Sequence, residues 1–139
     1  MSQDLYVQLQ PWMHLIGRLL FSSLFIVAGL HRLVKLNDLA AMAQSRGVPS
    51  AKALTALNGV LILIGGILVL LGWHRFIGAG LLVITILPQP FLIHAFWKET
   101  DPQQRVSETL HFMKDIALVG AALFIAAYSG FTWPMSLGG

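Results

Sequence analysis

The sequence predicts an all-α integral membrane protein: a four-helix bundle with a short interfacial helix between the first and second spans. Two observations lead to this fold class. Only 11% of the 139 residues are charged, whereas 56% are hydrophobic. Between the charged residues lie four apolar stretches. Each is close in length to the about 20 residues that one bilayer crossing requires. A soluble bundle is the weaker alternative, because helices that are apolar on all sides are typical of membrane spans.

One domain, residues 1–139, is expected, with spans at about residues 12–33, 52–73, 75–97 and 108–130. The second span is the clearest, because nothing from Ala53 to Trp73 is ionisable. The third follows Arg75 and contains Pro88 and Pro90, which should bend the helix. The fourth contains most of a long uncharged stretch, since no residue from Ile116 to Gly139 carries a charge.

The first span is the least apolar, and its polar residues share one stripe. Helical steps of three and four residues link the members of this stripe, which are His14, Arg18, Ser22, Phe25, Gly29 and Arg32. Charged side chains are costly inside a bilayer, so this stripe is expected to face the bundle interior. The alternative is that Arg18 and Arg32 extend toward opposite membrane surfaces.

A short helix is predicted in the connection between the first and second spans. Asn37 or Asp38 can cap its start, and Gly47 can end it. Its apolar residues lie on one face, which favours a helix at the membrane interface. At the N-terminus, Asp4 and the absence of basic residues before the first span are unlike a cleaved signal, so the first helix is expected to remain in the mature protein.

Charge and composition restrict the function. Most basic residues lie in the first and third connections, which the positive-inside rule places in the cytoplasm, with both termini on the other side. The net charge of +3 therefore sets orientation, and no nucleic-acid partner is expected. The chain has no cysteine, which excludes thiolate catalysis and Cys-ligated metal centres. Any redox chemistry must then use a bound cofactor.

A polar cluster is predicted where the third span meets the fourth. The candidate cofactor-binding residues there are Arg32, His94, Trp97, His111, Lys114 and Asp115. Asn58 lies at the same membrane level on the second span. The residues His14, Arg18 and Ser22 are candidates for a structural polar stripe instead.

Three interpretations of this cluster remain open. In the first, Asp115 neutralises Lys114 or Arg32 in an internal salt-bridge network. In the second, the cluster holds a quinone headgroup: Arg32, His94 or His111 donates to a carbonyl, Trp97 lies near the ring, and Asp115 orients a histidine or balances charge. In the third, two histidines and Asp115 form a facial metal site. The spacing does not select a metal, so none is expected.

Several motifs in order resemble the DoxX family of small four-span bacterial membrane proteins. The resemblance covers about residues 14–130 and rests on the segments Gly17-Arg18-Leu19-Leu20, Ala28-Gly29-Leu30-His31-Arg32-Leu33, Gly47-Val48-Pro49, Leu63-Ile64-Gly65-Gly66, His94-Ala95-Phe96-Trp97 and His111-Phe112-Met113-Lys114-Asp115. One position departs from the family pattern. Many members carry a Glu where this chain has Ile62, so any role of that carboxylate is lost here or has moved to Asp115.

The resemblance implies a multi-pass protein of the bacterial inner membrane that serves a redox system. Some family members are similar to the membrane subunit of thiosulfate:quinone oxidoreductase, which implies quinone as the cofactor. The expected partners are the lipid bilayer and other membrane protein subunits. Two other classes are alternatives: a non-catalytic structural or assembly subunit of a larger membrane complex, and a small transporter, which only the proline-broken third span supports.

Overall fold

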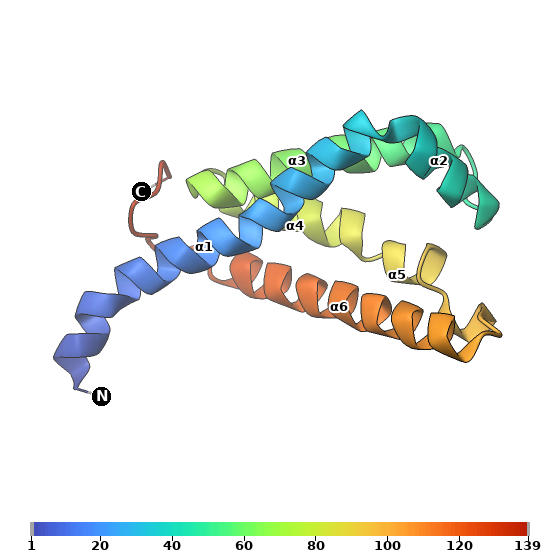
Figure 1. The fold of residues 1–139 in the computed structure, drawn as a ribbon. Helices are drawn as coiled ribbons and strands as arrows, with labels where there is room; N and C mark the ends of the chain where they lie inside the picture. The colour runs from blue at the N-terminus through green and yellow to red at the C-terminus, as the bar shows by residue number, and fades with distance from the viewer. Residues whose placement is uncertain (1, 139) are drawn as a thin grey trace.

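The fold is a bundle of helices in the computed structural model, which describes residues 2–138 (Figure 1). Its elements are α1 (Gln3–Val34), α2 (Leu36–Ser45), α3 (Ala51–Leu71), α4 (Arg75–Ile86), α5 (Gln89–Leu92), the 3-10 helix η1 (Phe96–Lys98) and α6 (Pro102–Ala127). Four helical segments are long and apolar enough to cross a membrane, with α4, α5 and η1 together forming the third. The predicted fold class is therefore confirmed.

The first and last spans begin earlier than the apolar stretches predict. The Ser2 hydroxyl caps α1 by accepting from the Leu5 N–H at 3.4 Å, and the Asp101 carboxylate caps α6 by accepting from the Gln104 N–H at 2.9 Å. Hydropathy marks only the crossing part, whereas capped polar turns extend the helix. At 1.5 Å per residue, the 32-residue α1 is about 48 Å long, and its first turns project beyond the bundle (Figure 1).

Close backbone approaches at glycine hold the helices together. A Cβ atom at Gly29 of α1 would lie 2.8 Å from the Gly59 carbonyl oxygen and 2.8 Å from the Leu63 Cβ, both on α3. A Cβ at Gly65 of α3 would lie 2.9 Å from the Gly78 oxygen on α4. Small residues at such crossings let the helices gain van der Waals contact in lipid.

The core of the bundle combines an apolar cluster with part of the polar stripe. Its buried members come from α1, α3, α4, α6 and the C-terminal segment: Phe25, Ile62, Val69, Leu82, Ile86, Val119, Ala122 and Trp133. Arg18 and Ser22 of the α1 stripe are also buried, as their spacing with Phe25 predicts.

The short helix α2 is present, although its predicted cap is wrong. Neither Asn37 nor Asp38 caps it, because the chain turns from α1 at Lys35, whose carbonyl accepts directly from the Leu39 N–H at 3.0 Å. Gly47, with φ of +81°, lies just after α2, as predicted. The buried Ala43 packs with apolar residues at the start of α3 and with Ile93.

The third span is broken at the two prolines, as predicted. The first part, α4, ends at Ile86, and the four-residue α5 begins just after Pro88. The backbone then leaves the helical path before η1, and the Ile93 carbonyl accepts a hydrogen bond from the Arg46 guanidinium. Because the helix ends after Leu92, the Ile93 carbonyl has no helical N–H donor, and a carbonyl left free inside a membrane protein needs a side-chain partner.

We predict that Gly29→Ala destabilises the fold by about 1–3 kcal/mol, because the new methyl group would overlap the backbone of α3. Gly17→Ala on the same helix is the matched control, since a Cβ there meets nothing within 4 Å. Thermal unfolding in one detergent would measure both variants. Equal unfolding midpoints would contradict the close crossing of α1 and α3.

Candidate functional site

A cavity of about 530 Å³ lies between the second half of α1, α2, α3 and the broken third span. Its lining is mostly apolar, with polar side chains from His31, Arg32, Thr55, Asn58, Thr85, Gln89 and His94. Leu39, Met42 and Ala43 of α2 form part of its wall, so the apolar face of that helix borders the cavity. A volume of this size and a lining with few polar groups are typical of small-molecule sites.

The helix break organises the polar side of the cavity. The Asn58 Nδ2 donates to the Thr85 carbonyl at 3.0 Å, and the Gln89 Nε2 donates to the same oxygen at 2.9 Å. The Gln89 Oε1 in turn accepts from Arg32 Nη2 at 2.7 Å. These bonds set the orientation of both amides. The Asn58 Oδ1 is buried and accepts no hydrogen bond from residues 2–138.

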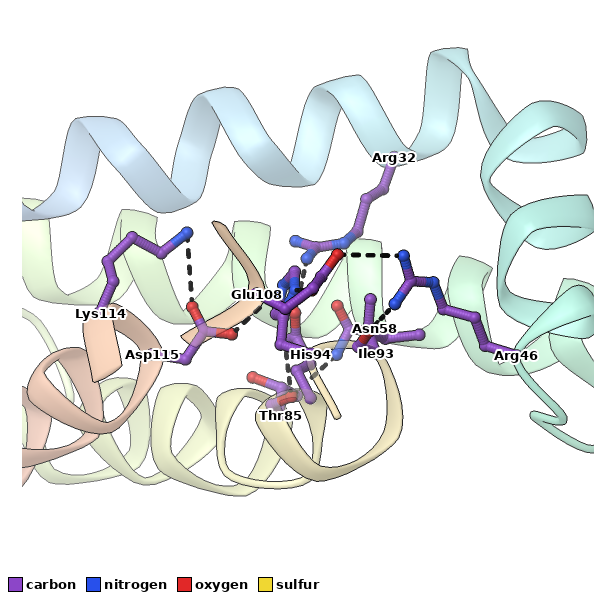
Figure 2. A network of polar contacts seen from close by, with 10 residues as sticks. Arg32, Arg46, Asn58, Thr85, Ile93, His94, Glu108, Lys114 and Asp115 are labelled. Atoms are coloured by element: carbon purple, nitrogen blue, oxygen red, sulfur yellow. Dashed lines mark hydrogen bonds and ion pairs between the residues drawn. The ribbon is translucent and has the colours of Figure 1, made fainter. Parts of the chain in front are cut away.

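Glu108 of α6 joins three segments beside the cavity (Figure 2). Its Oε2 lies 2.7 Å from His94 Nδ1, and its Oε1 lies 3.2 Å from the Nη2 of Arg46, which directly follows α2. The Gln104 Nε2 also donates to Oε1 at 3.1 Å. The side chain is only 6% exposed. A carboxylate buried in a membrane protein requires such partners, and here they are a cation, a histidine and an amide.

A second buried carboxylate, Asp115, lies on the other side of His94. Its Oδ2 is 3.9 Å from His94 Nε2, and its Oδ1 is 3.5 Å from Lys114 Nζ (Figure 2). The first distance is too long for a hydrogen bond. His94 therefore has one ring nitrogen bonded to Glu108 and a second nitrogen, near Asp115, that makes no hydrogen bond within residues 2–138.

The residues of the predicted cluster separate into two groups. Arg32 and His94 line the cavity, whereas His111, Lys114, Asp115 and Trp97 do not. The His111 ring stacks on the His94 ring with centroids 5.0 Å apart, so His111 packs against His94 without lining the cavity. Trp97 is 47% exposed and packs edge-on against Phe96 and Phe112.

The observed ion pairs can be compared with the interpretation in which Asp115 neutralises Lys114 or Arg32. Asp115 pairs with Lys114, one of its two predicted partners. Arg32 has no carboxylate within 4 Å among residues 2–138, and its observed side-chain partner is Gln89. Within the same residues, no three His, Asp or Glu side chains are placed to hold a metal ion. Ile62, at the position of the common family Glu, is 1% exposed in the apolar core.

Three residues of the site were not predicted: Arg46, Gln89 and Glu108. In the sequence, Arg46 is one of the basic residues of the first connection, which indicate only the orientation, and Gln89 lies between the two prolines, which indicate only a helix break. Glu108 lies at the predicted boundary of the fourth span, where a carboxylate is usually solvated. Its spacing of seven residues from Asp115 was the available signal, because that spacing places both carboxylates on one helix face.

The four apolar spans define this chain as a multi-pass membrane protein of the helical-bundle class. The family model for DoxX matches residues 13–95, and the chain belongs to the DoxX family. The match contains every residue that lines the cavity and ends before α6, so Glu108 and Asp115 lie outside it. No curated protein and no solved structure matches the chain.

We predict that Glu108→Ala lowers the free energy of unfolding by about 2 kcal/mol, because a charged hydrogen-bonding group contributes roughly 1.5–3 kcal/mol. Its loss would also leave Arg46 and His94 without their shared partner. Glu99→Ala is the control, since Glu99 has no cation within 4 Å among residues 2–138. Chemical unfolding in detergent would compare the two. A loss no larger than that of the control would show that the network is not stabilising.

Proposed function

We propose that this chain is a quinone-binding membrane component of a redox system in the bacterial inner membrane. The cavity of about 530 Å³ carries the proposal, because it joins an apolar volume to a small set of fixed polar groups. Quinones have the matching chemistry, with an apolar ring and tail and two carbonyl oxygens. As part of this proposal, the cavity lies on the cytoplasmic side of the membrane, and both termini lie on the opposite side.

Arg32 is the principal donor in this proposal. Its guanidinium carries five N–H groups, and Gln89 accepts from Nη2. The remaining donors can serve a carbonyl oxygen at the cavity wall. The buried Asn58 Oδ1, which lacks a partner, adds an acceptor that suits the hydroxyl of the reduced form. The residues present therefore fit both oxidation states of a quinone.

The apolar part of the cavity supports entry from the membrane. Leu57 of α3 and Ile84 of α4 line the cavity and are 53% and 68% exposed. In a bilayer these side chains face lipid, so a lipophilic molecule can reach the cavity laterally. Leu61 and Leu92 continue the apolar lining.

Proton exchange is assigned to His94. A bound quinone accepts two electrons and two protons when it is reduced, and the chain, which has no cysteine, needs a separate redox subunit to supply the electrons. The His94 Nε2 holds or releases a proton, while Glu108 fixes the ring through Nδ1.

A structural subunit of a larger membrane complex is the second candidate. One observation favours it: the first turns of α1 project beyond the bundle and expose Leu5, Tyr6, Leu9 and Trp12. Such a surface can contact another membrane protein. Mild purification from native membranes, with mass spectrometry of proteins and extracted quinones, separates the candidates. A quinone-free protein held in a large complex would favour the structural role.

We predict that Arg32→Gln weakens quinone binding by roughly tenfold or more, because it removes charged donors from the cavity. Binding of a short-chain ubiquinone or menaquinone to the purified protein would be followed by tryptophan fluorescence. Arg105→Gln, on the first turns of α6 and outside the cavity lining, is the matched control. Unchanged affinity in a folded Arg32→Gln protein would rule out the proposed donor.

We also predict that Leu39→Trp lowers quinone retention by filling the cavity from α2 without removing any polar group. Leu110→Trp places the same added volume on an exposed position of α6 and should bind quinone normally. Extraction and chromatography of quinone retained per protein would compare them. Equal retention in both variants would place the quinone outside this cavity.

A further inference from the structure

A second cavity, of about 420 Å³, lies at the opposite end of the bundle between α1 and α6. Among the described residues, no Cα atom of α1 lies within 8 Å of one in α6, so the two helices leave a groove here. Its lining is largely apolar and includes His14, Arg18, Phe21, Phe124, Tyr128 and Trp133. None of these residues lines the cavity proposed for quinone.

The C-terminal segment, residues 128–138, closes the end of this groove. The Leu137 N–H donates to the Leu71 carbonyl at 2.9 Å, so the segment turns back toward the end of α3 (Figure 1). Trp133 is only 7% exposed, and its ring contacts His14 with centroids 4.8 Å apart. The guanidinium carbons of Arg18 and Arg75 lie 5.9 and 5.0 Å from the same ring.

Two arginines at this end are held by carbonyl groups. Arg18 donates to the Met135 oxygen at 2.6 Å, and Arg75 donates to the Phe131 oxygen at 3.0 Å. Carbonyls orient a guanidinium without neutralising its charge. Neither arginine has a carboxylate within 4 Å among residues 2–138. The Arg18 Nε and the His14 Nδ1 are also buried without a hydrogen-bond partner in that part of the chain.

The positive charge is not balanced from further along the helices. Asp4 precedes His14 on α1 by about 15 Å of helix. Asp115 lies about 20 Å before Tyr128 on α6, and it is paired with Lys114. Within residues 2–138, the groove therefore presents an apolar wall with a cationic end that no carboxylate pairs.

We propose that this groove binds one anionic phospholipid. A groove on the lipid-facing surface of a membrane protein is filled by acyl chains, and Phe21 and Phe124 provide an apolar wall for one. Trp133 and Tyr128 place the arginine end near headgroup depth, where aromatic residues concentrate. An anionic headgroup balances Arg18 and Arg75, whereas the ammonium group of a zwitterionic lipid meets no carboxylate there among residues 2–138.

The test uses the full chain in mild detergent with an equimolar mixture of phosphatidylglycerol and phosphatidylethanolamine that have identical acyl chains. Native mass spectrometry counts the bound lipids. We expect one phosphatidylglycerol per chain in preference to phosphatidylethanolamine, and about a fivefold loss of that preference in Arg75→Gln. Arg75 is partly exposed, so its replacement leaves no buried charge unpaired.

Two further variants make the result specific. Arg75→Lys keeps the charge and should keep the lipid preference, whereas Arg105→Gln removes a cation elsewhere and should not change it. Equal binding of the two lipids to the unmodified chain would overturn the proposal. So would a loss in Arg75→Lys as large as that in Arg75→Gln, because the arginine would then act only by holding the C-terminal segment. Quinone binding does not enter this measurement.

Discussion

The carboxylate of Glu108 connects parts of the chain that apolar packing leaves apart. Among the described residues, α2 and α6 have no Cα atoms within 8 Å of each other, yet Arg46 reaches Glu108 from one to the other. The same carboxylate fixes the His94 ring through Nδ1. Because the group is buried, its partners cannot be exchanged for water at low cost. One side chain thus contributes both to the position of α2 over the cavity and to the orientation of His94.

The spans and the helix break could be predicted because their causes are local. Apolar length determines a bilayer crossing, and Pro88 and Pro90 lack the backbone donors that a continuous helix needs. The inward stripe of α1 could also be predicted, since helical periodicity alone places Arg18 and Ser22 beside Phe25. The boundaries were less accurate, because capped polar turns at Ser2 and Asp101 extend the helices beyond their apolar stretches.

The partners within the site could not be predicted in the same way. Arg46 meets Glu108 only because α2 folds over the start of α3, and nothing in the spacing of the two residues indicates this. Gln89 bonds Arg32 because the helix break turns its amide toward the Thr85 carbonyl and the cavity. Hydropathy and periodicity describe one helix at a time, whereas these contacts depend on how helices pack. The sequence therefore predicts that Arg32 and His94 belong to the site, but it does not predict which residues they bond to.

The length of α1 also constrains how the protein is held in the bilayer. A helix of about 48 Å would have to tilt by about 50° to fit a hydrocarbon core of about 30 Å, and membrane helices tilt by at most about 40°. Tilt alone cannot accommodate it, so the first turns lie in the headgroup layer. Pro11 interrupts the backbone bonding there, and Trp12 is exposed beside it. An exposed tryptophan at this level of the helix suits the membrane–water interface, which limits how deeply α1 can lie in the bilayer.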